Sequence, residues 1–181
     1  MLNSLFTWFY CLPMGNAVLL VAGCSLVYLL FARLIRNLWI RYPIHALFLT
    51  AWAALVIYMT VLMRRCDPGN AVDLIPFYSY YVALSGGNRE MLRSNLMNVL
   101  LFVPGGLLCG CLMPRNLKKW VSLSIVIAVF AVFSAGIEWM QLRNMLGDCQ
   151  TDDVIHNAFG AVIGAMSIHI PLKFKKEIRQ E

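Results

Sequence analysis

Residues 120–142 read WVSLSIVIAVFAVFSAGIEWMQL and contain one charged side chain, that of Glu138. Lys119 and Arg143 border this segment. About 20 consecutive apolar residues are enough for an α-helix to cross the hydrocarbon core of a bilayer. We therefore predict a transmembrane helix here, and the rest of the chain is interpreted outward from it.

Four further windows carry no charged side chain: residues 1–32, whose most apolar part is 17–32, and residues 42–63, 94–114 and 154–172. Because lipid cannot hydrogen-bond to backbone groups, these windows are predicted to be helices. None of them alternates steadily between apolar and polar residues, which argues against a barrel. The prediction is an all-α, polytopic membrane helix bundle with about five transmembrane helices, forming a single membrane domain over residues 1–181.

The composition of the 181-residue chain agrees with this class: 60% of its residues are hydrophobic and 13% are charged. A soluble domain averages about 25% charged residues. The mean hydropathy of +0.70 excludes a disordered or collagen-like chain. Nucleic-acid binding is excluded as well, because the sequence has no basic cluster within a polar surface.

Basic residues indicate the orientation of the bundle. Ten of the 15 Lys and Arg residues lie in the loops after the first and third windows or in the tail, whereas seven of the nine acidic residues lie on the other side. Cytoplasmic loops carry an excess of Lys and Arg. We therefore predict an outside N-terminus, a cytoplasmic C-terminus and a multi-pass location in the cell membrane.

The cysteines are interpreted as mainly structural. Within the predicted helices Cys behaves as a small hydrophobic residue, and this applies to Cys24, Cys109 and Cys111. The other three are expected to face outward: Cys11, Cys66 and Cys149. A disulfide such as Cys66–Cys149 is left open as an alternative. We predict no metal site and no cofactor, because the sequence has no ligand pattern typical of zinc.

Polar residues interrupt the outer ends of the last three windows. Asn98, Glu138 and Asn157 each lie ~6–8 Å along their helices from the outer boundary, at ~1.5 Å per residue. The polar residues of each window are three or four positions apart and so share one helix face. These faces are predicted to converge on a polar pocket open to the outer leaflet. The sets are Asn95 with Asn98, Glu138 with Gln141, and Asp153 with Asn157.

Glu138 is the strongest candidate for function, because a carboxylate in hydrocarbon costs ~2.5 kcal/mol or more on insertion scales. In a catalytic interpretation, Glu138 is a general base, and Asp153 is either its paired acid or the residue that orients it. In a binding interpretation, the phosphate of a head group is contacted by Arg93 and Arg143. Its other polar atoms are contacted by Asn95, Asn98, Gln141 and Asn157. A structural Glu–Arg pair is the alternative for Glu138.

Several of these residues also have plain structural interpretations. Asp152 and Asp153 are at a position to cap the last helix. Asn98 and Asn157 are suited to hydrogen bonds between helices, and Gly160-x-x-x-Gly164 is typical of a close helix contact. His156 is expected at the interface as a neutral ring rather than as a metal ligand.

The same residues resemble the VanZ-like family of small bacterial membrane proteins. The resemblance covers about residues 60–165, preceded by an extra N-terminal helix pair. It rests on four motifs in order: DLIPF at 73–77, NVLLFVPGG at 98–106, EWMQ at 138–141 and DVIHNAFGAVIG at 153–164. The chain departs from the family pattern at Asp73, where Asn is usual, and at Gln150, where an acidic residue is frequent.

The resemblance implies a bacterial cell-membrane location and, for the founding member of the family, low-level resistance to the glycopeptide teicoplanin. Two functions follow as hypotheses. The first is a non-enzymatic protein that binds membrane lipids, such as a lipid-linked wall precursor, or a lipoglycopeptide at the outer-leaflet pocket. The second is an intramembrane enzyme that modifies an envelope lipid through Glu138 and Asp153. A transporter is a third, although five spans without an inverted repeat are few for alternating access.

Overall fold

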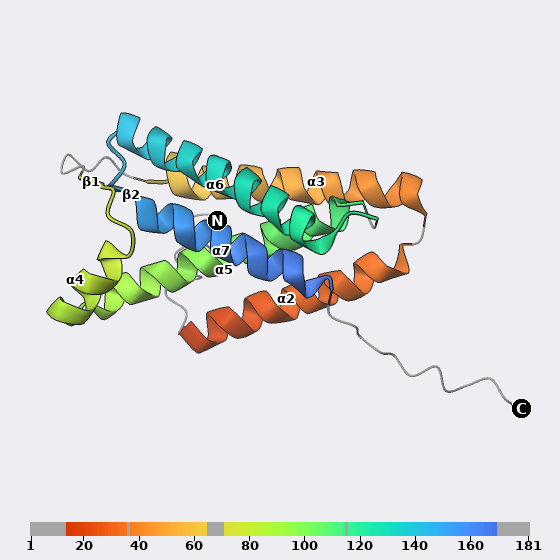
Figure 1. The fold of residues 1–181 in the computed structure, drawn as a ribbon, viewed down its shortest axis with the longest axis horizontal. Coiled ribbons are helices and arrows are strands. Elements are labelled where there is room, and N and C mark those ends of the chain that lie inside the picture. The colour runs from red at the N-terminus through yellow and green to blue at the C-terminus, as the bar shows by residue number, and fades with distance from the viewer. Residues whose placement is uncertain (1–13, 36, 65–70, 115, 170–181) are drawn as a thin grey trace, which may run out of the picture.

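The computed structural model describes residues 14–35, 37–64, 71–114 and 116–169. Its elements in chain order are α2 (Met14–Leu34), α3 (Leu38–Ile57), the π-helix η1 (Tyr58–Leu62), β1 (Val72–Asp73), α4 (Tyr78–Gly86), α5 (Arg89–Leu112), α6 (Lys119–Arg143), β2 (Cys149–Gln150) and α7 (Thr151–Ser167). The five long helices run lengthwise through the molecule, and α4, β1 and β2 gather at one end, called here the α4 end (Figure 1). At the opposite end α2, α5 and α7 finish, while α3 and α6 begin.

The predicted all-α fold is confirmed, and each of the five apolar windows contains one long helix. In the part of the chain that the structure describes, three helical segments are long and apolar enough to cross a membrane: Trp39–Leu62, Arg89–Leu112 and Lys119–Arg143. Among the described residues, the first window contributes a shorter apolar helix, Val18–Ala32, and α7 has 17 residues. The number of spans and the orientation of the termini remain predictions.

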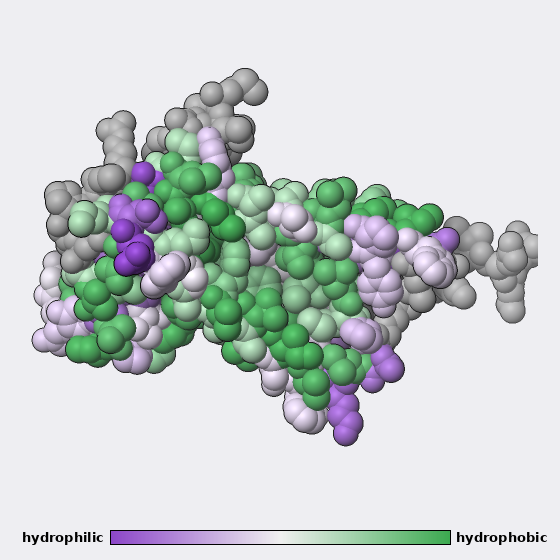
Figure 2. All heavy atoms as spheres, turned by 90° about the horizontal axis from the view of Figure 1, so that it is seen from above, coloured by the Kyte–Doolittle hydropathy of each residue, from purple (hydrophilic) through white to green (hydrophobic). Residues whose placement is uncertain are grey.

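Large apolar side chains cover the outside of the bundle. Leu19, Val132 and Trp139 expose 71%, 75% and 62% of their surface, respectively. On the face seen in Figure 2, hydrophobic residues occupy the middle of the molecule and hydrophilic residues gather toward the two ends. A contiguous apolar surface of this kind is unfavourable in water and suits contact with lipid.

The close packing of α7 on α5 depends on residues without a side chain. A Cβ atom added at Gly160 would collide with the backbone oxygen of Val99, and one added at Gly164 would collide with that of Val103. In the other direction, a Cβ atom at Gly106 would collide with the backbone of Ala161. The predicted close helix contact at Gly160-x-x-x-Gly164 is therefore confirmed, and it fixes the two helices that carry most of the site.

An aromatic cluster joins α3, α5 and α6. The ring of Trp52 lies 5.3 Å from that of Phe102 and 5.6 Å from that of Phe130, measured between centroids. Its indole Nε1 donates a 3.1 Å hydrogen bond to the carbonyl oxygen of Leu101. A Cβ atom at Gly105 would lie 2.6 Å from the indole ring. Trp52 therefore satisfies its polar atom while filling the space left by a glycine.

The elements β1, β2 and α4 were not predicted. The two strands pair in parallel, with Val72 opposite Cys149 and Asp73 opposite Gln150. Strands of two residues have no measurable periodicity, and the nine residues of α4 are too few to give a clear helical pattern. The strand pair ties the loop before α4 to the loop between α6 and α7, which bears on the site described next.

Candidate functional site

The carboxylate of Asp153 lies beside two of the other predicted site residues. Nδ2 of Asn98, on α5, donates a 2.7 Å hydrogen bond to Oδ1 of Asp153, on α7. Asp153 also lies close enough to Glu138, on α6, for the two carboxyl groups to interact electrostatically. The structure thus brings together one polar residue from each of α5, α6 and α7.

Glu138 is buried, with 4% of its surface exposed. Its Oε2 accepts a 3.0 Å hydrogen bond from the backbone N–H of Gln150. Gln150 belongs to β2 and is held in place by pairing with Asp73 of β1. The strand pair therefore positions the backbone donor that satisfies one oxygen of this buried carboxylate.

The cation beside the two carboxylates is Arg64, which the sequence analysis did not place in the site. Arg64 interacts electrostatically with both Glu138 and Asp153. It follows η1 and packs against Gly147, whose φ is +140° and where an added Cβ atom would lie 2.9 Å from a guanidinium nitrogen. The available signal was its position, as the first basic residue after the 42–63 window. Arg93 and Arg143 were considered instead because they border the helices that carry the polar residues of the predicted pocket.

A polar cavity of about 280 Å³ lies at this point of the α4 end. Arg64 and Asp153 contribute charged groups to its wall, and α5 contributes neutral polar groups. Of the predicted site residues, Asn95 and Asp153 line this cavity. Its full lining is Arg64, Asn88, Met91, Ser94, Asn95, Asp148, Gln150 and Asp153.

Arg93 and Arg143, predicted to attract a phosphate group, do not line the polar cavity. Arg143 is exposed, and its guanidinium carbon lies 5.9 Å from the centroid of the Trp139 ring. This is a cation–π geometry on the outer face of α6. Arg93 is half-buried on α5. Arg64 lies beside the carboxylates, where Arg93 and Arg143 were expected.

Gln141 and Asn157 are buried in contacts between helices. Nε2 of Gln141 donates a 2.9 Å hydrogen bond to the backbone oxygen of Thr60, in the π-helix η1. Nδ2 of Asn157 donates a 2.8 Å hydrogen bond to Oγ of Ser134, on α6. For these two residues the geometry matches the interpretation as hydrogen bonds between helices. Their predicted role in ligand binding remains a prediction.

Asp152 caps a helix other than its own. Its side chain, 3% exposed, accepts hydrogen bonds from the backbone N–H groups of Phe77 and Ser79 at the start of α4, the second at 2.9 Å. Burial favours a higher pKa for Asp152, but the hydrogen bonds from Ser79 and Phe77 outweigh it and lower the pKa. Nδ2 of Asn95 donates a 2.9 Å hydrogen bond to Oγ of Ser79 and so extends the contact to α5. The prediction that Asp152 caps the last helix is therefore wrong, because its side chain is bonded to the start of α4 instead.

His156 anchors the next turn of α4. Its Nε2 lies 2.8 Å from the hydroxyl oxygen of Tyr80, and the two rings meet edge to face with centroids 5.4 Å apart. Within the described parts of the chain, no group of three or more His, Cys, Asp or Glu residues is arranged to hold a metal ion.

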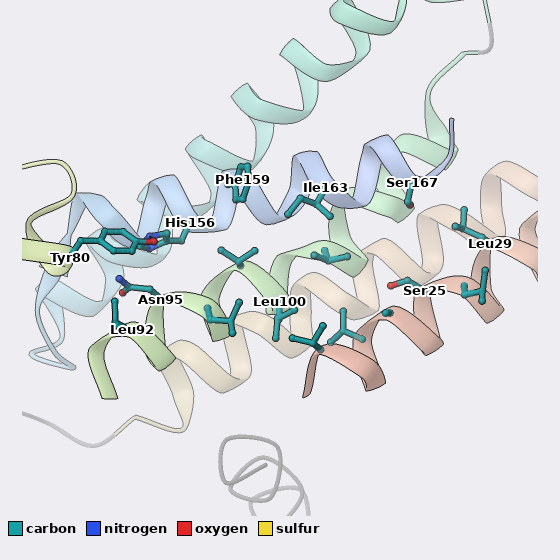
Figure 3. A pocket seen from close by; sticks show the side chains of 17 residues that line it. Ser25, Leu29, Tyr80, Leu92, Asn95, Leu100, His156, Phe159, Ile163 and Ser167 are labelled. Carbon is teal, nitrogen blue, oxygen red and sulfur yellow. The ribbon is translucent and has the colours of Figure 1, made fainter. Parts of the chain in front are cut away.

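An apolar groove of about 670 Å³ runs between α2, α5 and α7 (Figure 3). Tyr80, Asn95 and His156 lie together at one end, and the groove continues past Phe159 and Ile163 toward Ser167. Asn95 lines both this groove and the polar cavity. The groove and the cavity therefore adjoin at a single side chain.

The thiol of Cys149 lies near the two carboxylates of the site. Burial, followed by the charges of Glu138 and Asp153, raises the pKa of this thiol, which disfavours the thiolate. Cys149 is a free cysteine, whereas Cys11 and Cys66, the other cysteines expected to face outward, lie outside the described residues. Cys109 and Cys111 are buried, and Cys24 is exposed on α2.

One departure from the family pattern preserves a turn. Oδ1 of Asp73 accepts a 3.1 Å hydrogen bond from the backbone N–H of Ile75. Asn and Asp side chains both form this turn, because each presents an oxygen at the same distance from the backbone. Asp73 therefore performs locally what the more usual Asn would perform.

Comparison with protein-family models identifies the family of the chain. The family model described as VanZ/LLP1 matches residues 46–172, which include α5, α6, α7 and most of α3. The comparisons with curated proteins and with solved structures found no match. The match starts before residue 60, where the resemblance noted in the sequence begins, and it covers more than half of the chain. The chain belongs to the VanZ/LLP1 family.

Proposed function

We propose that this protein is a multi-pass protein of the bacterial cell membrane that binds an envelope amphiphile, either a lipid or a lipoglycopeptide, at the α4 end. The distribution of basic residues supports an outward-facing α4 end. The apolar exterior of the bundle supports its insertion in lipid. A link with resistance to teicoplanin, which the family resemblance implies, is part of the proposal.

The polar cavity is suited to a head group that carries both an anionic group and hydrogen-bond donors. Arg64 offers guanidinium N–H donors to an anion. Asp148 and Asp153 accept hydrogen bonds from hydroxyl, amide or ammonium groups. Ser94 and Asn95 add neutral donors and acceptors. Sugars, peptides and phosphates on a lipid carrier or a glycopeptide present this combination of groups.

The apolar groove is suited to one hydrocarbon chain. From His156 to Ser167 it follows α7 for about 16 Å, at ~1.5 Å per residue. This length is close to half of the ~30 Å hydrocarbon core, which is the depth of one leaflet. The groove is polar at the α4 end and mainly apolar along its length, in the same order as the head and the tail of a lipid.

The single observation that carries the proposal is the double role of Asn95, which lines both the polar cavity and the apolar groove. Its Nδ2 is bonded to Ser79, so the side chain is held at the junction. A molecule with its head in the cavity and its chain in the groove would pass this residue. An amphiphile is therefore the ligand class that uses both spaces at once.

Binding has more support than catalysis. Glu138 already accepts a backbone hydrogen bond, and Asp153 accepts one from Asn98. The thiol beside them, that of Cys149, has a raised pKa and is a poor nucleophile at neutral pH. The carboxylates are thus engaged in hydrogen bonds that fix the wall of the cavity.

The proposal is tested by binding measurements on the purified full-length protein in detergent. The probes are teicoplanin, the same glycopeptide with its acyl chain removed, and a polyprenyl phosphate. Ala22→Trp places an indole ring in the groove, and it is expected to weaken binding of the acylated probe by more than about tenfold, because each buried CH₂ group contributes ~0.8 kcal/mol. Arg64→Gln is expected to weaken binding of the polyprenyl phosphate through loss of a charged hydrogen bond.

Two variants serve as matched controls. Val27→Trp adds the same ring to α2 at a side chain that is 66% exposed and does not line the groove. Arg89→Gln removes an exposed charge on α5 outside the cavity. Both are expected to bind as the wild type does. Equal affinity for acylated and deacylated glycopeptide, together with no binding of the polyprenyl phosphate, would rule out the amphiphile. Equal effects of Ala22→Trp and Val27→Trp would remove the groove from the proposal.

A further inference from the structure

A second cavity, also of about 280 Å³, lies at the end of the bundle opposite α4. The ends of α2, α5 and α7 and the first turns of α3 and α6 form its walls. Arg41, Ser122 and His169 bring polar side chains to it, and Leu29, Leu117 and Ile168 bring apolar ones. The charge-bearing residue among these is Arg41, on α3.

Arg41 is nine-tenths buried, with 9% of its surface exposed. Its Nη2 donates a 3.3 Å hydrogen bond to the backbone oxygen of Cys111. Its Nε is buried without a hydrogen-bond partner. A guanidinium group stays protonated in proteins, so Arg41 carries a full positive charge into the interior.

Protein groups near Arg41 supply no compensating negative charge among the described residues. The acidic side chains of the described residues all belong to the α4 end: Asp73, Glu90, Glu138, Asp148, Asp152 and Asp153. The neighbours of the guanidinium are Tyr28 and His45, whose hydroxyl oxygen and Nδ1 are 2.5 Å apart. These groups offer hydrogen bonds but no negative charge. A buried charge without a partner is strongly unfavourable, so an anion from outside the described chain would stabilise it.

We propose that this cavity binds the phosphate group of an anionic phospholipid from the leaflet at that end. Arg41 is three residues from the start of α3, about 4.5 Å along the helix, so a head group at this end of the bundle reaches it after entering by less than one helical turn. The apolar part of the cavity wall suits the upper part of an acyl chain. Basic pockets between transmembrane helices on the cytoplasmic side are typical sites for anionic head groups.

The charge of the surrounding loops supports the same ligand. Besides Arg41, nine of the other 14 Lys and Arg residues belong to the loops after the first and third windows and to the tail. They raise the local concentration of anionic lipid, whereas the buried guanidinium provides one defined contact. The inference is independent of the function proposed for the α4 end, because the two sites lie at opposite ends of the bundle.

The test measures lipid binding by the purified full-length protein with phosphatidylglycerol, phosphatidylcholine and inorganic phosphate as probes. Native mass spectrometry is expected to show one retained phosphatidylglycerol with about a tenfold preference over phosphatidylcholine, the effect of a charge-assisted hydrogen bond. Arg41→Gln should abolish this preference, and Arg41→Lys, which keeps the charge, should retain part of it. Lys119→Gln removes an exposed charge at the same end and should leave the preference unchanged.

Thermal unfolding of the wild type provides a second measurement if Arg41→Gln assembles poorly. Phosphatidylglycerol should raise the Tm of the wild type and of Lys119→Gln, and phosphatidylcholine should not. The proposal is overturned if Arg41→Gln and Lys119→Gln lose the preference equally, because attraction would then be general. Full competition by inorganic phosphate would assign the site to a free anion.

Discussion

Asp152 and Asp153 are adjacent in the sequence and have different roles in the structure. Asp152 accepts hydrogen bonds from the first backbone N–H groups of α4 and is held ionised by them. Asp153 faces Asn98 and lines the polar cavity beside Arg64. Neighbouring positions on a helix point about 100° apart, so a pair of acidic residues serves two surfaces at once. A sequence motif that contains both acids does not separate these roles.

Glu138→Gln is expected to leave the fold intact and to weaken binding at the α4 end by about tenfold. The amide oxygen of Gln can still accept the hydrogen bond from Gln150, so packing is retained. Arg64, the cation near Glu138, is exposed, so its loss of a charged neighbour costs ~1 kcal/mol or less. What is removed is the negative charge beside Arg64 and Asp153, two residues that line the cavity. The measurement is probe binding together with the Tm of the purified variant.

A poorly assembled Glu138→Gln variant would favour the structural Glu–Arg pair considered for this residue, because assembly would then depend on the charge of Glu138. A stable variant with wild-type affinity would remove Glu138 from the binding site. Asp153→Asn tests the neighbouring carboxylate in the same way, since Asn98 can still donate to an amide oxygen.

At the scale of the elements, the contact of α5 with α7 depends on Gly160. Gly160→Leu is expected to lower the stability of the protein by about 3 kcal/mol or more, because its Cβ atom would collide with the backbone of Val99. For a chain of this size the loss corresponds to a Tm decrease of about 6–12 °C. Thermal unfolding of the purified protein in detergent measures it.

Gly136→Leu is the matched control for this substitution. Gly136 is exposed on α6, and an added Cβ atom meets nothing within 4 Å. Leu has a higher helix propensity than Gly, so this variant should be as stable as the wild type or slightly more stable. Equal losses in the two variants would mean that helix packing at Gly160 is not the cause.

The elements that the sequence predicted are those with a strong local signal. An uninterrupted apolar window identifies a helix such as α6, and the spacing of Gly160 and Gly164 identifies a helix contact. The pairing of β1 with β2 and the capping of α4 by Asp152 join residues more than 70 positions apart. The sequence around each of these residues does not specify which distant residue it will contact. For the same reason Arg64 was missed, since it reaches Glu138 and Asp153 from a different helix hairpin.

At the scale of the whole molecule, charge is divided between the two ends of an apolar bundle. The described acidic residues belong to the α4 end, and most basic residues of the chain belong to the loops and the tail at the other end. Each end also has a cavity of about 280 Å³, one lined by both acidic and basic groups and the other by the buried Arg41. The two proposed ligands therefore belong to opposite leaflets, and the orientation of the bundle decides which leaflet each one is taken from.

We predict that the C-terminus is cytoplasmic. A fluorescent protein that folds only in the cytoplasm, fused after Glu181, should be bright, and an alkaline phosphatase that is active only outside should be silent at the same position. The reason is the concentration of Lys and Arg in the loops at this end, which resist translocation. Fusion of each reporter within the loop between α6 and α7 is the matched control and should give the reverse pattern. An active phosphatase at the C-terminus would mean that the topology is inverted. The polar cavity would then take its amphiphile from the inner leaflet, and Arg41 would face the outer one.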